Sequence, residues 1–170
     1  MSPAPRWRST AAPPCDPLPV KTRYGLEIRA ATSADAPAVG ELLGMAGHAV
    51  SPIALARRLE AIRQGSGTAL VAMEWGPPSG IVVLHWFRGL DADQPAARIT
   101  TLLVAPAERR RGIGRLLLKS AAQAARVAGC DALELAADPD DPTLPGFCLA
   151  TGFTEADRCF IRPLRKKTLL

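Results

Sequence analysis

The chain has 170 residues, of which 48% are hydrophobic and 22% charged, and its formal net charge at neutral pH is +5. These values fit one ordinary globular domain, and no apolar run approaches the roughly 20 residues that a membrane-spanning helix needs. The four cysteines form no CxxC pair and have no histidine at metal-ligand spacing. The sequence therefore predicts reduced thiols in a cytoplasmic protein, with no metal site. With 5% aromatic residues and no recognition motif, it also argues against nucleic-acid binding.

The first half of the chain predicts a leader followed by one strand, two helices and two further strands. Residues 1–23 are rich in proline and lack the apolar core of a secretory signal, so we expect a disordered leader before a domain over residues 24–165. A strand is expected over 26–32, where Thr32 and Asp35 form a capping-box pattern that starts a helix reaching about residue 47. Ser51 and Pro52 predict the start of a second helix that ends near residue 65. Strands are then expected over 68–75 and 80–87, joined by a tight turn.

The second half alternates strands and helices. A polar loop over 89–96 leads to a long strand over 97–105, and apolar residues at helical spacing predict a helix from 112 to about 127. A strand over 131–138, a short helix over 144–153, a last strand over 157–164 and a basic tail over 166–170 follow. The expected fold class is α/β, a single-domain mixed and mostly antiparallel sheet flanked by helices, in the order β α α β β β α β α β.

A cluster of positive charge lies at the start of the predicted helix at 112. Arg109, Arg110, Arg111 and Arg115 stand where the helix dipole already places positive charge, and cations are normally favoured at the opposite end. The preceding VAPAE offers no Ser, Thr, Asp or Asn next to Gly112 to cap the first amides. Free amides and guanidinium groups together predict a bound anion, with a pyrophosphate as the candidate. An exposed basic turn on an ordinary helix is the alternative.

The glycine spacing at this helix start points to one family. Neither the Walker pattern nor the dinucleotide pattern fits, but R-x-x-G-x-G does, as Arg109, Gly112 and Gly114, preceded by LLVAP and followed by RLLL. At these residues the chain resembles the Gcn5-related N-acetyltransferase (GNAT) superfamily, in its small-molecule or aminoglycoside-type branch. The resemblance covers about residues 26–164, and GFCLATGF stands in place of the family's usual FYxxxGF.

The resemblance implies the acyl-CoA N-acyltransferase fold, with acetyl-CoA as co-substrate and no metal. The pantetheine arm would pair with the backbone of the strand before the motif, and the pyrophosphate would contact amides of the helix start. The cofactor-binding residues implied are Leu102, Leu103, Val104, Arg109, Arg110, Arg111, Gly112, Ile113, Gly114 and Arg115. Core packing is the other reading of Leu102 and Val104, and both readings can hold together.

The catalytic groups implied by the resemblance are only partly present. Many family members carry a glutamate base near Thr100 or Thr101, and here both positions are threonine. His85 on the neighbouring strand is the best replacement base by residue type, with a structural role as the alternative. Glu134 would relay a proton through water or be a plain solvated carboxylate. Cys148 takes the place of the tyrosine acid, as a weak proton donor or a small buried residue.

These observations predict an N-acetyltransferase that moves an acetyl group from acetyl-CoA to a primary amine, with a small-molecule acceptor favoured over a protein N-terminus. The alternative is a weakly active or inactive acyl-CoA-binding regulatory module that has kept the cofactor site. Many relatives dimerise, and a homodimer is compatible with this chain.

Overall fold

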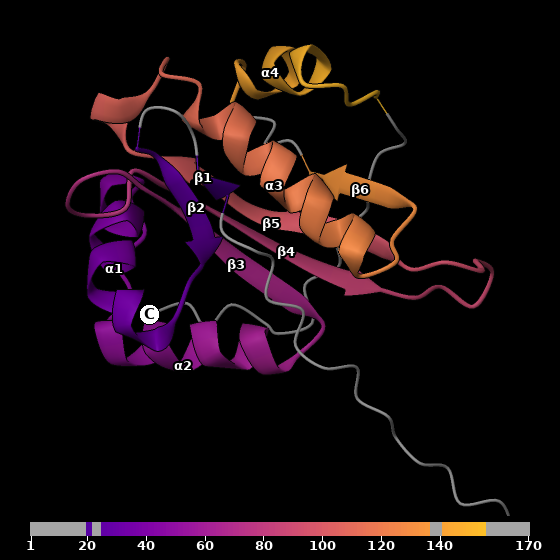
Figure 1. Cartoon of the computed structure of the whole chain (residues 1–170), viewed down its shortest axis with the longest axis horizontal. Helices are drawn as coiled ribbons and strands as arrows, with labels where there is room; N and C mark the ends of the chain where they lie inside the picture. Colours follow the sequence, from indigo (N-terminus) through magenta and orange to yellow (C-terminus); the bar gives the residue numbers. More distant parts are fainter. Residues whose placement is uncertain (1–19, 22–24, 137–140, 156–170) are drawn as a thin grey trace, which may run out of the picture. The chain divides into compact units, whose positions relative to one another are not determined.

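The computed structural model describes residues 20–21, 25–136 and 141–155. The chain divides into two compact units, residues 1–136 and 137–170. The first unit holds a six-stranded sheet whose strands lie in chain order (Figure 1). The strands are β1 (Val20–Lys21), β2 (Glu27–Ala30), β3 (Gly67–Met73), β4 (Gly80–Phe87), β5 (Ala96–Val104) and β6 (Ala132–Leu135). Neighbours from β1 to β5 are antiparallel, and β5 and β6 are parallel.

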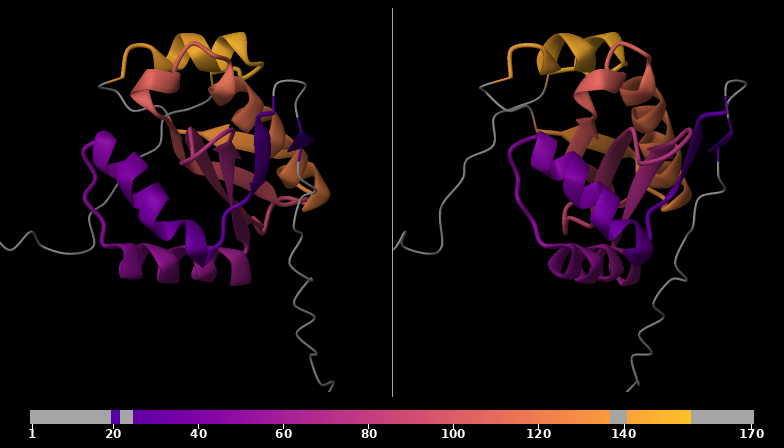
Figure 2. Two further views of the ribbon diagram at one scale, coloured as in Figure 1. Left: turned by 60° about the vertical axis from the view of Figure 1, so that its left-hand side comes forward. Right: turned by 90° about the vertical axis from the view of Figure 1, so that its left-hand side faces the viewer.

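Three α-helices of the first unit cover the sheet. Helices α1 (Ala36–Met45) and α2 (Pro52–Gln64) lie on one face, and α3 (Ile113–Val127) lies on the other (Figure 2). Two 3-10 turns, η1 (Ser33–Asp35) and η2 (Pro106–Glu108), lead into α1 and toward α3. The second unit contains α4 (Leu144–Ala150). None of the described helices is long and apolar enough to cross a membrane.

The first two helices begin where the local sequence predicts. The Thr32 amide donates to Asp35 Oδ2 at 2.7 Å in the expected capping box. Arg29 also binds Asp35, because its Nη2 donates a hydrogen bond to Asp35 Oδ1 at 2.7 Å. This hydrogen bond is the main reason that the pKa of Asp35 falls to about 2. At the start of α2, Ser51 Oγ accepts from the Ala54 amide at 3.3 Å, as an N-cap should.

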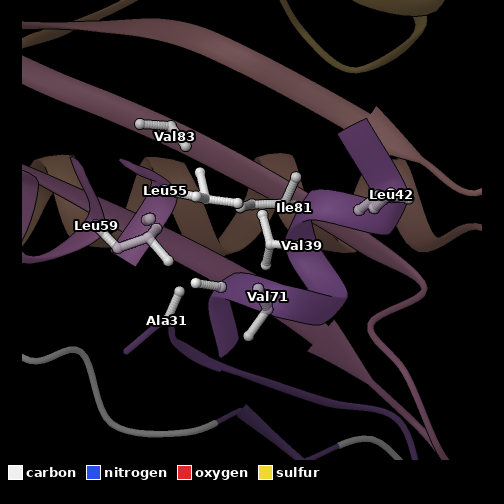
Figure 3. Close-up of a cluster of buried hydrophobic side chains, with 10 residues drawn as sticks. Ala31, Val39, Leu42, Leu55, Leu59, Val71, Ile81 and Val83 are labelled. Atoms are coloured by element: carbon white, nitrogen blue, oxygen red, sulfur yellow. The ribbon is translucent and has the colours of Figure 1, made fainter. Parts of the chain in front are cut away.

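Alternation along the central strands builds a core on each face of the sheet. Val71, Ile81 and Val83 pack with α1 and α2, whose Val39, Leu42, Leu55 and Leu59 are buried against them (Figure 3). Side chains of a strand alternate between faces, so Leu70, Val82 and Leu84 point toward α3. All three are fully buried, as is Leu117 of α3. The central strands β3 and β4 are therefore covered on both sides.

The predicted fold class is confirmed, because a mixed and mostly antiparallel sheet is flanked by helices in the order β α α β β β α β α from β2 onward. Two details differ. Val20 and Lys21, expected in a disordered leader, pair with Ile28 and Glu27 as a short strand. The strand expected over 131–138 ends at Leu135, where its pairing with β5 ends. The last predicted strand (157–164), the basic tail (166–170) and residues 1–19 of the leader lie outside the described residues.

Candidate functional site

Strand β5 changes its pairing halfway along its length. On one side it pairs with β4 from Ala96 to Val104, but on the other side it pairs with β6 only from Ala96 to Ile99. Within the described part of the chain, residues 100–104 therefore have no strand partner on the β6 side. A strand edge of this kind presents backbone donors and acceptors to an extended ligand.

A β-bulge lies at the point where the two strands part. Val83 is opposite Thr101 and Leu84 is opposite Ile99, so Thr100 has no residue opposite it. The Thr100 hydroxyl donates to Val83 O at 3.5 Å. A bulge bends its strand and leaves the extra residue out of the ladder. The bulge coincides with the point at which the pairing of β5 with β6 ends.

The turn after β5 has an unusual backbone. Arg110 adopts φ 66° and Gly112 adopts φ 82°, so two left-handed residues flank Arg111. Left-handed backbone is uncommon for a residue with a side chain and costs roughly 1 kcal/mol or more. A Cβ added at Gly112 would meet nothing within 4 Å. Glycine is therefore required at this position by its backbone angle, whereas the surrounding space is open.

The amides of this turn lack acceptors. Gly112 is the N-cap of α3 and, as the sequence predicts, no side chain caps the helix. The first backbone bond of the helix runs from the Leu116 amide to Gly112 O at 3.1 Å. Among the described residues, no acceptor is bonded to the six successive amides from Arg110 to Arg115. An uncapped helix leaves four such amides, and here the turn adds two more.

The four arginines of this turn have different surroundings. Arg111 donates to Glu74 Oε2 at 2.9 Å and to a carboxylate oxygen of Glu108, which raises the pKa of its guanidinium. Arg109 Nε donates to Val104 O at 3.4 Å. Arg110 and Arg115 are exposed, and neither is within ion-pair distance of a carboxylate in the described ranges. The side chains with charge available for an anion are therefore mainly those of Arg110 and Arg115.

Gly80 brings α3 close to the sheet. This first residue of β4 lies opposite Val104. A Cβ at Gly80 would be 2.9 Å from Leu103 O, 2.9 Å from Leu117 Cδ1 and 3.3 Å from Ile113 Cγ2. The glycine motif of the sequence does not include Gly80. Its only sequence signal is a glycine at the start of a β-rich run.

A row of polar side chains crosses the other half of β5. Gly67 is opposite His85, His85 is opposite Arg98, and Arg98 is opposite Glu134. By alternation these residues share the face that α1 and α2 cover further along the strands. Arg98 donates to Glu134 Oε2 from Nε at 2.9 Å and from Nη2 at 2.7 Å, and its guanidinium lies 5.3 Å from the Phe87 ring centre. No motif in the sequence singles out Arg98.

The two predicted base candidates are in one row but are not in contact. His85 is half-buried beside Gly67, where a Cβ would lie 2.8 Å from His85 Nδ1. Glu134 is two strands away, which corresponds to about 10 Å at ordinary strand spacing. Arg98 occupies the position between them, and both of its hydrogen bonds go to Oε2 of the carboxylate. The Arg98–Glu134 pair is half-exposed: 47% of the Arg98 side chain and 44% of the Glu134 side chain are accessible to solvent.

Cys148 belongs to the second unit, on α4. It is a free thiol, and partial burial raises its pKa, so the protonated form is favoured near neutral pH. The Thr151 hydroxyl of the same helix donates to Phe147 O at 2.8 Å and to Cys148 O at 3.0 Å. In the described ranges, no three His, Cys, Asp or Glu side chains are grouped so that they could hold a metal ion.

Comparison with known proteins agrees with this geometry. The model of the family described as "Acetyltransferase (GNAT) family" matches residues 33–153. A structure from Agrobacterium tumefaciens is 28% identical with TM-score 0.71, covering 80% of this chain and 99% of its own. The Trypanosoma brucei acetyltransferase is 24% identical with TM-score 0.70, covering 82% and 99%.

A third similar structure is AAC(6')-Iy in complex with the bisubstrate analog CoA-S-monomethyl-acetylneamine. It is 20% identical to the chain with TM-score 0.71, covering 83% of this chain and 99% of its own. Comparison with the curated proteins gave no match. The family match spans well over half of the sequence and includes both β5 and the arginine-rich turn. The chain belongs to the GNAT family of acetyltransferases.

Proposed function

We propose that the protein is an N-acetyltransferase that moves an acetyl group from acetyl-CoA to a primary amine of a small molecule. The observation that carries this proposal is the free edge of β5 over residues 100–104, which continues into six amides without acceptors. Five strand residues span about 15 Å, a length that suits an extended arm. The amides at the end of that edge suit a diphosphate.

In this proposal the backbone of Leu102, Leu103 and Val104 pairs with the pantetheine arm. The amides from Arg110 to Arg115 bind the pyrophosphate, and the exposed guanidinium groups of Arg110 and Arg115 neutralise part of its charge. Ile113 and Gly114 contribute amides only. When bound, acetyl-CoA supplies an activated acetyl group and a thiol leaving group. In this proposal an unpaired backbone amide of β5 near the bulge would donate a hydrogen bond to the thioester oxygen and stabilise the negative charge that develops there.

His85 is the proposed base for the acceptor. An alkyl ammonium group has a pKa near ~10.4, so a proton must leave the nitrogen before it attacks. His85 is half-buried and stands on the face of the sheet next to the bulge. Glu134 is less suited to this role, because two hydrogen bonds from Arg98 already occupy its Oε2. Its Oε1 has no partner in the described part of the chain, so we assign Glu134 to binding the acceptor's ammonium group or to relaying its proton through water.

Cys148 is proposed as a weak donor to the departing thiolate. Its raised pKa keeps the proton on sulfur near neutral pH. A thiol of pKa about 8.5 is already a tolerable leaving group, so this donation adds little to the rate. In this proposal, having Cys148 in place of the family's tyrosine lowers the rate of acetyl transfer only modestly.

The small-molecule acceptor is supported by the half-exposed polar row beside the bulge. Glu134 belongs to that row, and Asp91 and Asp93 lie in the loop that joins β4 to β5. Carboxylates favour a cationic amine. An aminoglycoside-type acceptor fits this charge, and the similar AAC(6')-Iy structure is a complex with an acetylneamine analog.

One observation favours a second candidate, an acyl-CoA-binding module without turnover. The threonines at 100 and 101 leave β5 without a carboxylate base, and Arg98 engages the carboxylate on the next strand. Calorimetric titration with CoA, followed by assay of thiol release from acetyl-CoA with a panel of amines, separates the two. Micromolar binding with amine-dependent thiol release supports the enzyme. Binding with background release for every amine supports the module, and no binding refutes both.

A further inference from the structure

Arg111 stands apart from the other arginines of the turn, because two carboxylates from different segments hold its guanidinium. Glu74 follows β3 directly, and Glu108 is the last residue of η2. Nη2 of Arg111 donates to Glu74 at 2.9 Å, and Nη1 donates to Glu108. The side chain therefore joins the connection between β3 and β4 to the turn that leads into α3.

The backbone before Arg111 needs support. Arg110 adopts φ 66°, whereas the φ of 82° at Gly112 costs a glycine no strain. A residue with a side chain persists in left-handed backbone only where its surroundings fix it. A planar guanidinium group donates hydrogen bonds in two fixed directions at once, whereas a lysine ammonium group does not. Glu74 and Glu108 are only 24% and 31% exposed, against 50% for Arg111, so both carboxylates are less accessible to solvent than the arginine that they bind.

We propose that Arg111 is a positioning residue for the cofactor turn: its bonds to Glu74 and Glu108 hold the amides from Arg110 to Arg115 together for a diphosphate that its own guanidinium does not bind. This inference deepens the proposed function and depends on it for the identity of the ligand. It assigns Glu74, 37 residues away in sequence, to the cofactor site.

The proposal and simple electrostatics predict opposite signs for one substitution. Removing a carboxylate near an anion site relieves repulsion and frees Arg111, so electrostatics alone predicts that Glu74→Gln strengthens CoA binding. If Arg111 acts by positioning, the same substitution loosens the turn and weakens binding by about tenfold, an ordinary coupling for groups in one hydrogen-bond network. The sign of the change therefore decides between the two roles of Arg111.

The experiment measures the dissociation constant of CoA by calorimetry for the wild type, Glu74→Gln, Arg111→Gln, Arg111→Lys and the Glu74→Gln/Arg111→Gln double variant. Glu60→Gln is the matched control, because Glu60 also pairs with an exposed arginine, Arg63, but on α2. We expect Glu74→Gln and Arg111→Gln each to weaken binding about tenfold, with no further loss in the double variant. Arg111→Lys should recover part of the affinity, and Glu60→Gln should stay within twofold.

Kinetics distinguish this role from a general structural one. If the turn alone is affected, KM for acetyl-CoA rises in Glu74→Gln while KM for the acceptor amine does not. Tighter or unchanged CoA binding in Glu74→Gln would overturn the proposal, and so would additive losses in the double variant.

A readout on the ligand-free protein separates failure of this proposal from failure of the proposed function. Trypsin cleaves after arginine, so mass spectrometry can follow cutting after Arg109, Arg110 and Arg111. We expect Glu74→Gln to be cut several times faster there than Glu60→Gln, because the turn opens more often. Equal rates refute positioning by Arg111 whether or not CoA binds, whereas a wild type that ignores CoA refutes the proposed function alone.

Discussion

Replacing Gly80 with alanine tests whether the close contact between α3 and the sheet supports both stability and the cofactor edge. The new Cβ would lie 2.9 Å from Leu103 O and 2.9 Å from Leu117 Cδ1. The carbonyl belongs to β5 and moves only with its strand, and Leu117 is fully buried, so its side chain has little space for another rotamer. Overpacking of this kind costs about 1–3 kcal/mol. For a chain of this size that corresponds to a fall in Tm of roughly 3–10 °C.

Urea denaturation of Gly80→Ala and the wild type, followed by circular dichroism, measures the loss. Gly44→Ala is the control with the opposite sign, since Gly44 lies in α1 and a Cβ there meets nothing within 4 Å. It should gain about 0.5–1 kcal/mol from helix propensity. We also expect weaker CoA binding for Gly80→Ala, because a shift of Leu103 also displaces its neighbours Leu102 and Val104, which lie in the stretch of β5 proposed for pantetheine. A Gly80→Ala variant as stable as the wild type would refute the packing argument.

Gly112→Ala and Gly129→Ala should each lower the free energy of unfolding by about 1 kcal/mol, because both residues have φ near 80° with open space around them. Calorimetry should show weaker CoA binding only for Gly112→Ala. Equal CoA affinities of the two variants would count against the amide site. Asp35→Asn should lose about 2 kcal/mol of unfolding free energy at pH 7, since the pKa of Asp35 is lowered from 3.8 to about 2 in the folded state. That contribution is present above pH 4 and disappears as the pH falls toward 2. Urea denaturation should therefore show the difference in unfolding free energy between the wild type and Asp35→Asn shrinking over this range. A difference that does not change with pH would contradict the lowered pKa of Asp35. His85→Gln should lower kcat at least about tenfold with CoA affinity unchanged, whereas Glu134→Gln should mainly raise KM for the amine; the reverse pattern would exchange their roles.

Local signals in the sequence account for most of the fold. Thr32 with Asp35 and Ser51 with Pro52 place the starts of the first helices, because a cap depends only on residues three or four positions apart. The uncapped start at Gly112 is equally local, and the structure agrees with it. The short strand at Val20 has no comparable signal, since its pairing partner lies in β2.

The site was predictable only in part, because its details depend on contacts between distant segments. In the sequence, Arg111 resembles the other arginines as a phosphate ligand, and only the structure shows that it pairs with Glu74. Arg98 and Glu134 are 36 residues apart, and their pairing follows from the register between β5 and β6. Gly80 likewise gains its importance from the atoms of α3 and β5 that surround it. The catalytic roles of His85, Glu134 and Cys148 remain predictions.

The parting of β5 and β6 has a consequence for handling the protein. Over the described residues, the second half of β5 offers an unsatisfied ladder in the interior of the sheet instead of at its rim. Such a ladder can recruit an extended segment from another molecule, which is the first step of strand-mediated aggregation. A ligand that pairs with this edge lowers, by mass action, the fraction of molecules that can aggregate in this way. Purification and storage with excess CoA should therefore keep preparations monodisperse for longer than buffer alone.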